Sequence, residues 1–466
     1  MLTENKLQSK NGLFAVMAAF LLSFFLFNDL GIRYIFGYAV LGVILLALAI
    51  KSKFAVYFSA EKLLFVFMVI VTAVFSVLPS SNLGHLVISL SISMLMFTGY
   101  YIFMAPGTKV LYRFFIALHI LCVFFSVYLF VVKLFPEFYW NHIYKYLGEY
   151  TREIAARFIP QGYGVPIGGS TTYAAYMIFI ALISNMGLLL INGLPKTVKN
   201  RILFFATSIL YFAAIMLTNR RSEGLGTIAA MGIMFLLSVS IHTKGDLRKK
   251  LIIMVIAIVL IIAIVLGLAA CGFLVRYNDL VGFIAPDVQE PSLPDDPLPD
   301  EELTADEVSG GRLALWSQAG SLFLKNPVLG IGWEQFMNYN ENEHDVHNTY
   351  LQWLCEAGVI GFVLLFVPLV SIYVLTLKRM LRIKKADNVC KQAKILNFIS
   401  LAMQTFFLLI NVLDPAYYHL NYFCFFALAL VLNDTAAKLE TIDTGVEHDC
   451  LRNRLLPKLS KLKIFY

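Results

Sequence analysis

Long apolar segments recur along the whole chain and alternate with short polar stretches. Most of these segments are close in length to the roughly 17–25 residues that an α-helix needs to cross a bilayer. The strands of a transmembrane barrel are only about ten residues long and alternate between apolar and polar positions. The segments cover residues 12–27, 31–50, 62–78, 85–104, 110–134, 172–191, 202–218, 224–241, 251–275, 358–377, 395–413 and 420–432. The pattern therefore predicts about 12 transmembrane helices and excludes a transmembrane barrel.

The predicted fold is an all-α polytopic membrane protein with a short helical extracytoplasmic region. Two of the connections are long enough to be more than turns. The expected divisions are residues 1–134, with helices one to five; 135–171, an outer loop; 172–275, with helices six to nine; 276–357, an extracytoplasmic loop; 358–433, with the last three helices; and 434–466, a basic cytoplasmic tail.

The composition agrees with this fold class. Hydrophobic residues make up 59% of the chain, charged residues 14%, and the mean hydropathy is +0.75. Soluble domains carry about 25% charged residues. The 6 cysteines include no CxxC pair, so the sequence indicates neither a disulfide framework nor a metal site of that type.

Lysine and arginine gather in alternate connections, and cytoplasmic loops carry an excess of these residues. With the N-terminus inside, the basic clusters at 244–250 and 378–394 and the basic tail fall on one side of the membrane. This predicts cytoplasmic termini and places 135–171 and 276–357 outside. The net charge of +7 then reflects orientation and contact with membrane lipids, not a nucleic-acid partner.

The second outer connection has two different parts. Residues 285–310, "APDVQEPSLPDDPLPDEELTADEVSG", are acidic and rich in proline, a composition that buries too little apolar surface to fold alone. The following "GRLALWSQAGSLFLK" has a helical period and is ended by Pro327 and Gly330. We expect a short amphipathic helix that lies on the membrane.

Two adjacent arginines follow segment 202–218 at its predicted outer end, in "NRRSEG". Arginines at the membrane edge are functional candidates by default because they are costly to insert. Two interpretations stay open for Arg220 and Arg221. They snorkel to lipid phosphate with Glu223 as a partner, or they bind a substrate phosphate, whose oxygens fit the guanidinium fork.

The polar stretch "EHDVHN" precedes the segment that begins at Gly358. A neutral imidazole accepts a proton from a hydroxyl at physiological pH, so His347 is a candidate general base. Two other interpretations stay open: His344, Asp345 and His347 bind a metal, or His347 caps the next helix. Gly358 and Gly361 form a small-xx-small step that allows a neighbouring helix to approach closely.

Together, "TNRRSEG", "GGRLALWSQAGSLFLKNPVLGIGWEQF" and "HNTYLQWLCEAGVIG" resemble the O-antigen ligase and polymerase superfamily of bacterial envelope glycosyltransferases. The similarity is most specific in the last segment. Ligases carry His-Asn, nine residues and then Gly-x-x-Gly. His347, Asn348, Gly358 and Gly361 reproduce this arrangement.

The resemblance extends to three further residues. Arg221 corresponds to the arginine that ends a helix after "LT", and Arg312 to the arginine of "G-x-R-L-A". Taken alone, Arg312 would be a solvated surface residue. Asp414, in "VLDPAYY", stands where ligases often have an acidic residue. The motifs begin only at about Thr218, whereas the similarity in topology covers the whole chain.

The resemblance implies transfer of a glycan from a polyprenyl diphosphate to an acceptor hydroxyl outside the bacterial inner membrane, with no metal and no cofactor. The acceptor is lipid A-core or another lipid-linked chain. Residue chemistry agrees, because the departing diphosphate needs positive charge and the acceptor hydroxyl needs a base. The expected roles are catalytic for His347, diphosphate-binding for Arg221, Arg312 and Arg220, and supporting for Asn348, Gly358, Gly361 and Asp414.

Aromatic residues near these motifs have two interpretations. They stack on sugar rings, or they belong to the belt of aromatic residues at the membrane surface. The residues concerned are Tyr163, Trp316, Trp333 and Tyr350.

Two alternative functions follow from the same features. A polymerase adds the glycan to another polyprenyl-linked chain, and the motifs do not separate it from a ligase, although the uninterrupted histidine motif favours the ligase. A transporter or flippase of lipid-linked sugars would need charged residues near the bilayer midplane that line a path. The apolar segments hold almost none.

Overall fold

The computed structural model describes residues 34–51, 59–77, 108–166, 171–192, 197–239, 311–340, 344–385 and 391–444, together with short stretches between them. Within these ranges every regular element is helical. Six of the described helices are long and apolar enough to cross a membrane: Phe114–Leu134, Thr171–Ile191, Val198–Leu217, Thr349–Ile383, Lys391–Leu413 and Tyr422–Glu440.

An all-α membrane protein is thus confirmed. The predicted number of about 12 spans depends in part on segments 12–27, 85–104 and 251–275, which lie wholly or largely outside the described residues. The acidic, proline-rich residues 285–310 and the tail from 445 lie outside them as well.

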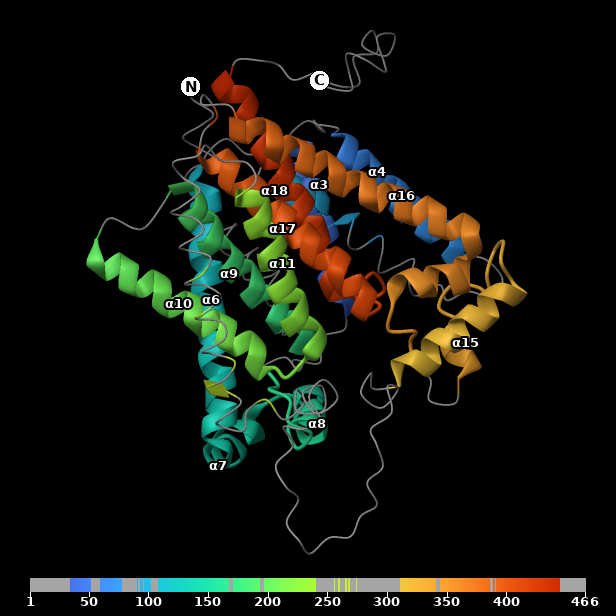
Figure 1. Ribbon diagram of the computed structural model, residues 1–466, viewed down its shortest axis with the longest axis horizontal. Helices are drawn as coiled ribbons and strands as arrows, with labels where there is room; N and C mark the ends of the chain where they lie inside the picture. The colour runs from blue at the N-terminus through green and yellow to red at the C-terminus, as the bar shows by residue number, and fades with distance from the viewer. Residues whose placement is uncertain are drawn as a thin grey trace, which may run out of the picture.

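The described helices are named in chain order (Figure 1). They are α3 (Tyr34–Lys51), α4 (Ala60–Ser76), α6 (Thr108–Leu134), α7 (Pro136–Phe138), α8 (Glu149–Phe158), α9 (Thr171–Asn192), α10 (Val198–Leu217), α11 (Arg221–Val239), α15 (Arg312–Lys325), α16 (Thr349–Lys385), α17 (Lys391–Leu413) and α18 (Leu420–Thr444). Short π and 3-10 turns cover Tyr139–Ile143, Tyr144–Tyr146 and Phe336–Tyr339.

Helix α17 is the centre of the bundle. It packs against α9, α11, α16 and α18, while α4 lies along α16 and α15 packs on the first part of α16 (Figure 1). Aromatic rings fill the space around α17: Phe406 stacks on Tyr176 and Phe179 of α9, with ring centroids 4.7 Å and 4.6 Å away. Because lipid is as apolar as these side chains, such close packing supplies much of the attraction between membrane helices.

Two ion pairs, each with a buried carboxylate, join the start of α4 to the C-terminal halves of α16 and α18. Lys62 Nζ lies 2.8 Å from Asp434 Oδ2, and an Arg379 terminal nitrogen lies 3.1 Å from Glu61 Oε1. Arg379 belongs to the basic cluster at 378–394, and the structure pairs it, like the buried Lys62, with a carboxylate inside the bundle. Each charge is paired, as buried charges must be to avoid a large desolvation penalty.

The loop after α15 is joined to α16 by backbone hydrogen bonds. The amides of Val359 and Ile360 donate to the carbonyls of Pro327 and Val328, at 2.8 Å and 3.3 Å. In the opposite direction, the amide of Ile331 donates to the carbonyl of Cys355 at 3.0 Å. Helix α16, which begins at Thr349 and not at Gly358, is kinked here, so the loop supplies partners that the broken helix lacks.

Two glycines make this crossing of backbones possible. Gly358 has φ 63° and ψ −170°, and a Cβ there would lie 2.3 Å from the carbonyl of Val328. A Cβ on Gly330 would lie 2.3 Å from the backbone of Glu356. The sequence suggested that Gly358 admits a neighbouring helix, but the structure places the α15–α16 loop there. Gly361 does face a helix, since its Cβ would lie 3.0 Å from Phe75 of α4.

Candidate active site

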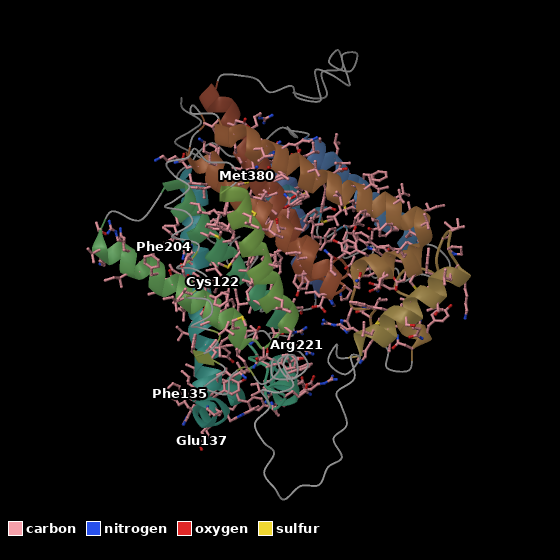
Figure 2. All side chains as sticks on the ribbon, viewed as in Figure 1. Cys122, Phe135, Glu137, Phe204, Arg221 and Met380 are labelled. Atoms are coloured by element: carbon pink, nitrogen blue, oxygen red, sulfur yellow. The ribbon has the colours of Figure 1, made fainter. Side chains whose placement is uncertain are left out.

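Four segments that are distant in sequence meet at one end of the bundle. They are the turn between α10 and α11, the first turn of α15, the stretch that enters α16, and the turn between α17 and α18. Figure 2 shows Arg221 at this end of α11, on the side of α8. Helix α8 belongs to the connection predicted to lie outside, which is fixed to the turn after α10 by a hydrogen bond from the Gly164 amide to the Thr218 carbonyl at 3.3 Å.

His347 and Asp414 form the centre of the site. His347 Nδ1 lies 3.2 Å from Asp414 Oδ1, although the two residues are 67 positions apart. An ionised carboxylate only accepts hydrogen bonds, so Nδ1 carries the proton in this contact. In the neutral imidazole the other nitrogen, Nε2, then has a free lone pair. The pair is therefore arranged to take up a proton at Nε2.

The environment keeps Asp414 ionised. Burial by itself would raise the pKa of this carboxyl group, but the hydrogen bond from His347 and the charges of Arg220 and Arg312 outweigh burial. The pKa of Asp414 is held well below its usual range. The carboxylate is thus available to orient His347 at any physiological pH and to stabilise the imidazolium that forms when Nε2 gains a proton.

Arg312 approaches the same carboxylate from α15. One of its terminal nitrogens lies 3.7 Å from Asp414 Oδ1. The side chains of Arg312 and His347 are 26% and 34% exposed, whereas that of Asp414 is 6% exposed. Arg312 and His347 thus line the open face of the site and Asp414 lies behind them. Gly311, with φ 78°, lets the chain turn into α15 directly before Arg312.

The two neighbouring arginines differ in their surroundings. Arg220 lies in the turn before α11, where its Nε donates to Thr171 Oγ1 at 2.9 Å and its guanidinium lies 5.8 Å from the ring centre of Tyr163. Arg221 is the first residue of α11, directly before Ser222, which contacts Asp414. Asn219 has φ 53°, a left-handed conformation that is favourable mainly for Gly, Asn and Asp, and it turns the chain sharply between the helices.

The stretch that carries His347 is strained and then capped. His347 itself has φ 54°, a conformation that is costly for a residue with a Cβ and that often occurs at functional sites. The cap of α16 is Asn348, whose Oδ1 accepts from the amides of Tyr350 and Leu351 at 3.0 Å and 3.1 Å. The interpretation that His347 caps the helix is therefore wrong, and its ring is directed to Asp414.

The metal interpretation concerned His344, Asp345 and His347. The rings of His344 and His347 are 6.4 Å apart, centre to centre. Within the described part of the chain, no group of three or more His, Cys, Asp or Glu side chains is arranged to hold a metal ion.

The suggested sugar-stacking residues do not all face the site. Trp333 is fully buried and stacks on Tyr418, with ring centroids 5.0 Å apart, so it is placed neither to stack on a sugar nor to belong to a surface belt. Tyr350 donates its hydroxyl to the Leu408 carbonyl at 3.0 Å. Tyr163 is half-buried beside Arg220, which leaves it the better placed of these aromatic residues.

Sequence reasoning missed two residues that support the site. Ser222 lies 2.9 Å from Asp414 Oδ2. Glu356 is buried, and it accepts hydrogen bonds from the amide of Glu334 at 2.9 Å and from the hydroxyl of Tyr418 at 2.8 Å. Glu356 thus joins the loop after α15 to the turn that carries Asp414. Its signal in the sequence was a single carboxylate inside an otherwise apolar helix.

Comparison with protein families finds a match to part of this chain. The model of the family described as O-antigen ligase matches residues 206–366, about a third of the 466 residues. The matched region contains α11, α15 and the start of α16, with Arg220, Arg221, Arg312 and His347. Comparison with curated proteins finds no match. The family match confirms the resemblance to O-antigen ligases and polymerases that the motifs indicated.

Proposed function

We propose, on the basis of the O-antigen ligase match, that the protein is a membrane glycosyltransferase that moves a glycan from a polyprenyl diphosphate to an acceptor hydroxyl. The observation that carries this proposal is the His347–Asp414 pair with Arg312 beside it. A base and a cation on the open face of one site are what such a transfer needs. The reaction takes place on the outer face of the bacterial inner membrane and uses no metal ion.

In the proposed transfer, one proton leaves the acceptor hydroxyl and one diphosphate group leaves the donor. His347 Nε2 takes the proton of the acceptor hydroxyl as its oxygen bonds to the anomeric carbon of the donor. The bond from that carbon to the phosphate oxygen breaks, and the polyprenyl diphosphate leaves with the electron pair. Arg312 and Arg221 hold the negative charge that develops on the diphosphate, and Asp414 stabilises the His347 imidazolium.

The charges around the site suit an anionic donor. Arg220, Arg221 and Arg312 bring three positive charges to the site, which also holds the carboxylates of Glu223, Asp414 and Asp345, and Arg312 lies on its open face. A guanidinium group also presents paired N–H donors that match the oxygens of a phosphate. The cost of placing arginines at the membrane edge is then offset when the diphosphate binds.

A ligase is the form of this function that we favour, and a polymerase is the alternative. The two differ in the acceptor, which is lipid A-core for a ligase and a second polyprenyl-linked glycan for a polymerase. Supplying the purified protein with donor and with each acceptor separately distinguishes them. Transfer to lipid A-core alone supports the ligase, and elongation of the donor pool without core supports the polymerase.

A lipid-linked sugar flippase is less consistent with the bundle. Four charged residues of the described helices form two ion pairs, Lys62 with Asp434 and Arg379 with Glu61. They lie in the first turn of α4 and in the C-terminal halves of α16 and α18. A transport path would instead place charges along the middle of the spans.

The orientation of the protein gives one direct test. We expect a cysteine at Tyr146, which is 79% exposed in the outer loop, to react with a membrane-impermeant maleimide added to intact spheroplasts. A cysteine at Lys391, which is exposed at the start of α17, should react only after the membrane is opened. The native Cys122, Cys355 and Cys424 are buried, and Cys271, Cys390 and Cys450 are replaced by serine in the background for this experiment. The reverse pattern would rule out an extracytoplasmic site.

The diphosphate role of Arg221 gives a second test. Arg221→Ala should weaken donor binding by roughly 10- to 100-fold, since a charge-assisted hydrogen bond contributes about 1.5–3 kcal/mol. Arg221→Lys should restore only part of the affinity, because an ammonium is a point charge without the fork. Binding of lipid-linked glycan to purified variants measures both effects.

Arg201→Ala is the matched control, because Arg201 is an exposed arginine at the opposite end of α10. It should bind donor as the wild type does. Equal affinity of Arg221→Ala and wild type would remove Arg221 from the donor site.

A further inference from the structure

A second buried carboxylate lies behind the His347–Asp414 pair. Glu223 is fully buried on the first turn of α11. Its Oε1 accepts hydrogen bonds from Thr172 Oγ1 of α9 at 3.0 Å and from the Tyr422 hydroxyl of α18 at 2.8 Å. Glu223 is therefore held by donors from two other helices. It has no role in the transfer reaction proposed above.

One hydroxyl connects this carboxylate to the site. Ser222 Oγ lies 2.7 Å from Glu223 Oε2 and 2.9 Å from Asp414 Oδ2. Asp414 Oδ1 faces His347, so contacts run without interruption from His347 through Asp414 and Ser222 to Glu223. Ser222 has a single hydroxyl proton, so it donates to one of the two carboxylates while its oxygen stays fixed between them.

The contact with Ser222 determines how the Asp414 carboxylate is oriented. The terminal torsion of an aspartate is broad, so the plane of its carboxylate is set by its partners. With Oδ2 held by Ser222, Oδ1 is directed to His347. Without Ser222 the carboxylate would be free to rotate toward Arg312, which lies 3.7 Å from Oδ1, and His347 would lose the acceptor that fixes its tautomer.

We propose that Glu223 is a positioning residue for glycan transfer, which acts through the Ser222 hydroxyl to fix the Asp414 carboxylate and thereby the His347 ring. The inference rests on the proposed function, because His347 is taken as the base of that reaction. Glu223 does not touch the donor or the acceptor. Its effect should therefore be found in turnover and not in donor affinity.

The hydrogen-bond pattern predicts which substitution is tolerated. In Glu223→Gln, the amide oxygen accepts from Thr172 and Tyr422, and the amide nitrogen donates to Ser222. The Ser222 proton then points to Asp414, so every contact in the chain is kept. We expect Glu223→Gln to retain turnover within about threefold of wild type. The hydrogen bond between residue 223 and Ser222 is kept in this variant and changes only in strength.

Removal of the chain should lower turnover. Glu223→Ala and Ser222→Ala should each reduce it by roughly 10- to 100-fold, the range known for outer hydrogen-bonding partners of metal-site ligands, with donor affinity nearly unchanged. Because Glu223 acts through Ser222, the turnover of the double variant should equal that of the less active single variant. The two values should agree within about twofold, which is the usual error of additivity for independent mutations. Ser222→Ala removes one hydroxyl only, so it tests the proposal even if Glu223→Ala folds poorly.

Glu440→Ala is the matched control for losing a buried carboxylate. Glu440 lies near the end of α18, where Arg382 approaches within 3.1 Å, away from the site. This variant should be less stable, with unchanged turnover per folded molecule. The proposal would be overturned if the loss of turnover in the Ser222–Glu223 double variant were the product of the two single losses. It would also be overturned if Ser222→Ala kept full turnover.

A readout that does not need glycan transfer separates the inference from the proposed function. Diethyl pyrocarbonate modifies neutral imidazoles, and mass spectrometry measures the rate at each histidine. His347 should react faster in Ser222→Ala and Glu223→Ala than in wild type, with the exposed His344 unchanged as an internal reference. If wild type transfers no glycan but this difference is found, only the proposed function fails. Equal His347 rates in all variants would reject the positioning role.

Discussion

Replacing His347 with alanine will lower the turnover of glycan transfer by roughly 10²–10⁴-fold, the range typical for loss of a general base, while donor binding stays nearly intact. The reason lies in the geometry of the pair. His347 Nδ1 faces Asp414 at 3.2 Å, so the free lone pair is on Nε2, at the open face of the site. The alanine variant keeps the arginines that hold the diphosphate but has no group to accept the proton.

Asp414→Asn tests the same arrangement without removing the imidazole. An asparagine amide can donate to Nδ1, which would move the ring proton to Nε2 and leave no lone pair for the acceptor hydroxyl. We therefore expect a loss of turnover comparable to that of His347→Ala. The two substitutions combined should lower turnover no further, because both remove one function.

Both variants are compared with His344→Ala, which removes an exposed histidine three positions upstream. Transfer from purified lipid-linked glycan in liposomes gives turnover, and donor binding is measured separately on the same preparations. Full turnover of His347→Ala would exclude it as the base. Complete loss of wild-type activity on adding a chelator would exclude the metal-free mechanism.

Gly358→Ala will prevent α15 from docking on α16 and will destabilise the fold by about 3 kcal/mol or more. The backbone conformation of Gly358, φ 63° and ψ −170°, is essentially restricted to glycine and costs another residue about 1–3 kcal/mol, and overpacking typically adds about 1–3 kcal/mol. Here the added Cβ would lie 2.3 Å from the backbone of Val328, which cannot move away as a flexible side chain would. The same reasoning applies to Gly330→Ala, against the backbone of Glu356.

Gly320→Ala is the control for this experiment. Gly320 is in the interior of α15, and a Cβ there meets nothing within 4 Å. Alanine at such a position favours a helix by roughly 0.5–1 kcal/mol. Thermal unfolding in detergent should therefore show a marked loss for Gly358→Ala and none for Gly320→Ala. Equal midpoints in Gly358→Ala and wild type would mean that the loop does not cross the helix at this glycine.

The backbone crossing at Gly330 and Gly358 also bears on the relative position of the candidate site residues. The crossing fixes the loop that follows α15 to the helix that follows His347. Arg312 begins α15 and His347 precedes α16, so both residues depend on this contact for their relative position. We expect Gly358→Ala to lose transfer activity beyond its loss of folded protein, because a shift of about 1 Å in a catalytic group is costly.

The spans were predictable because hydropathy is a local property. Segments 172–191 and 395–413 correspond closely to α9, Thr171–Asn192, and α17, Lys391–Leu413. The start of α16 was not predictable in the same way. The sequence of its first turns is mixed, and the glycine that was expected to begin the helix instead marks a kink within it.

The candidate residues were found by motif, and their arrangement was not. His347, Arg221 and Arg312 stood out as polar residues at the ends of apolar segments. Asp414 had only a loose match, yet it is the residue that His347 and Arg312 both contact. Ser222 gave no signal at all, because one serine beside two arginines has no distinguishing pattern.

The sequence by itself determined that this is an all-α membrane protein, where many of its helices lie, and which polar residues are too costly at a membrane edge to be incidental. Only the tertiary structure decided which of these residues work together. The contacts from Asp414 to His347 and to Ser222 span 67 and 192 positions, and hydropathy and helical period carry no information at such separations. They depend on how α11, α16, α17 and α18 pack, and that packing is set by the shapes of buried side chains and by single glycines that let backbones cross.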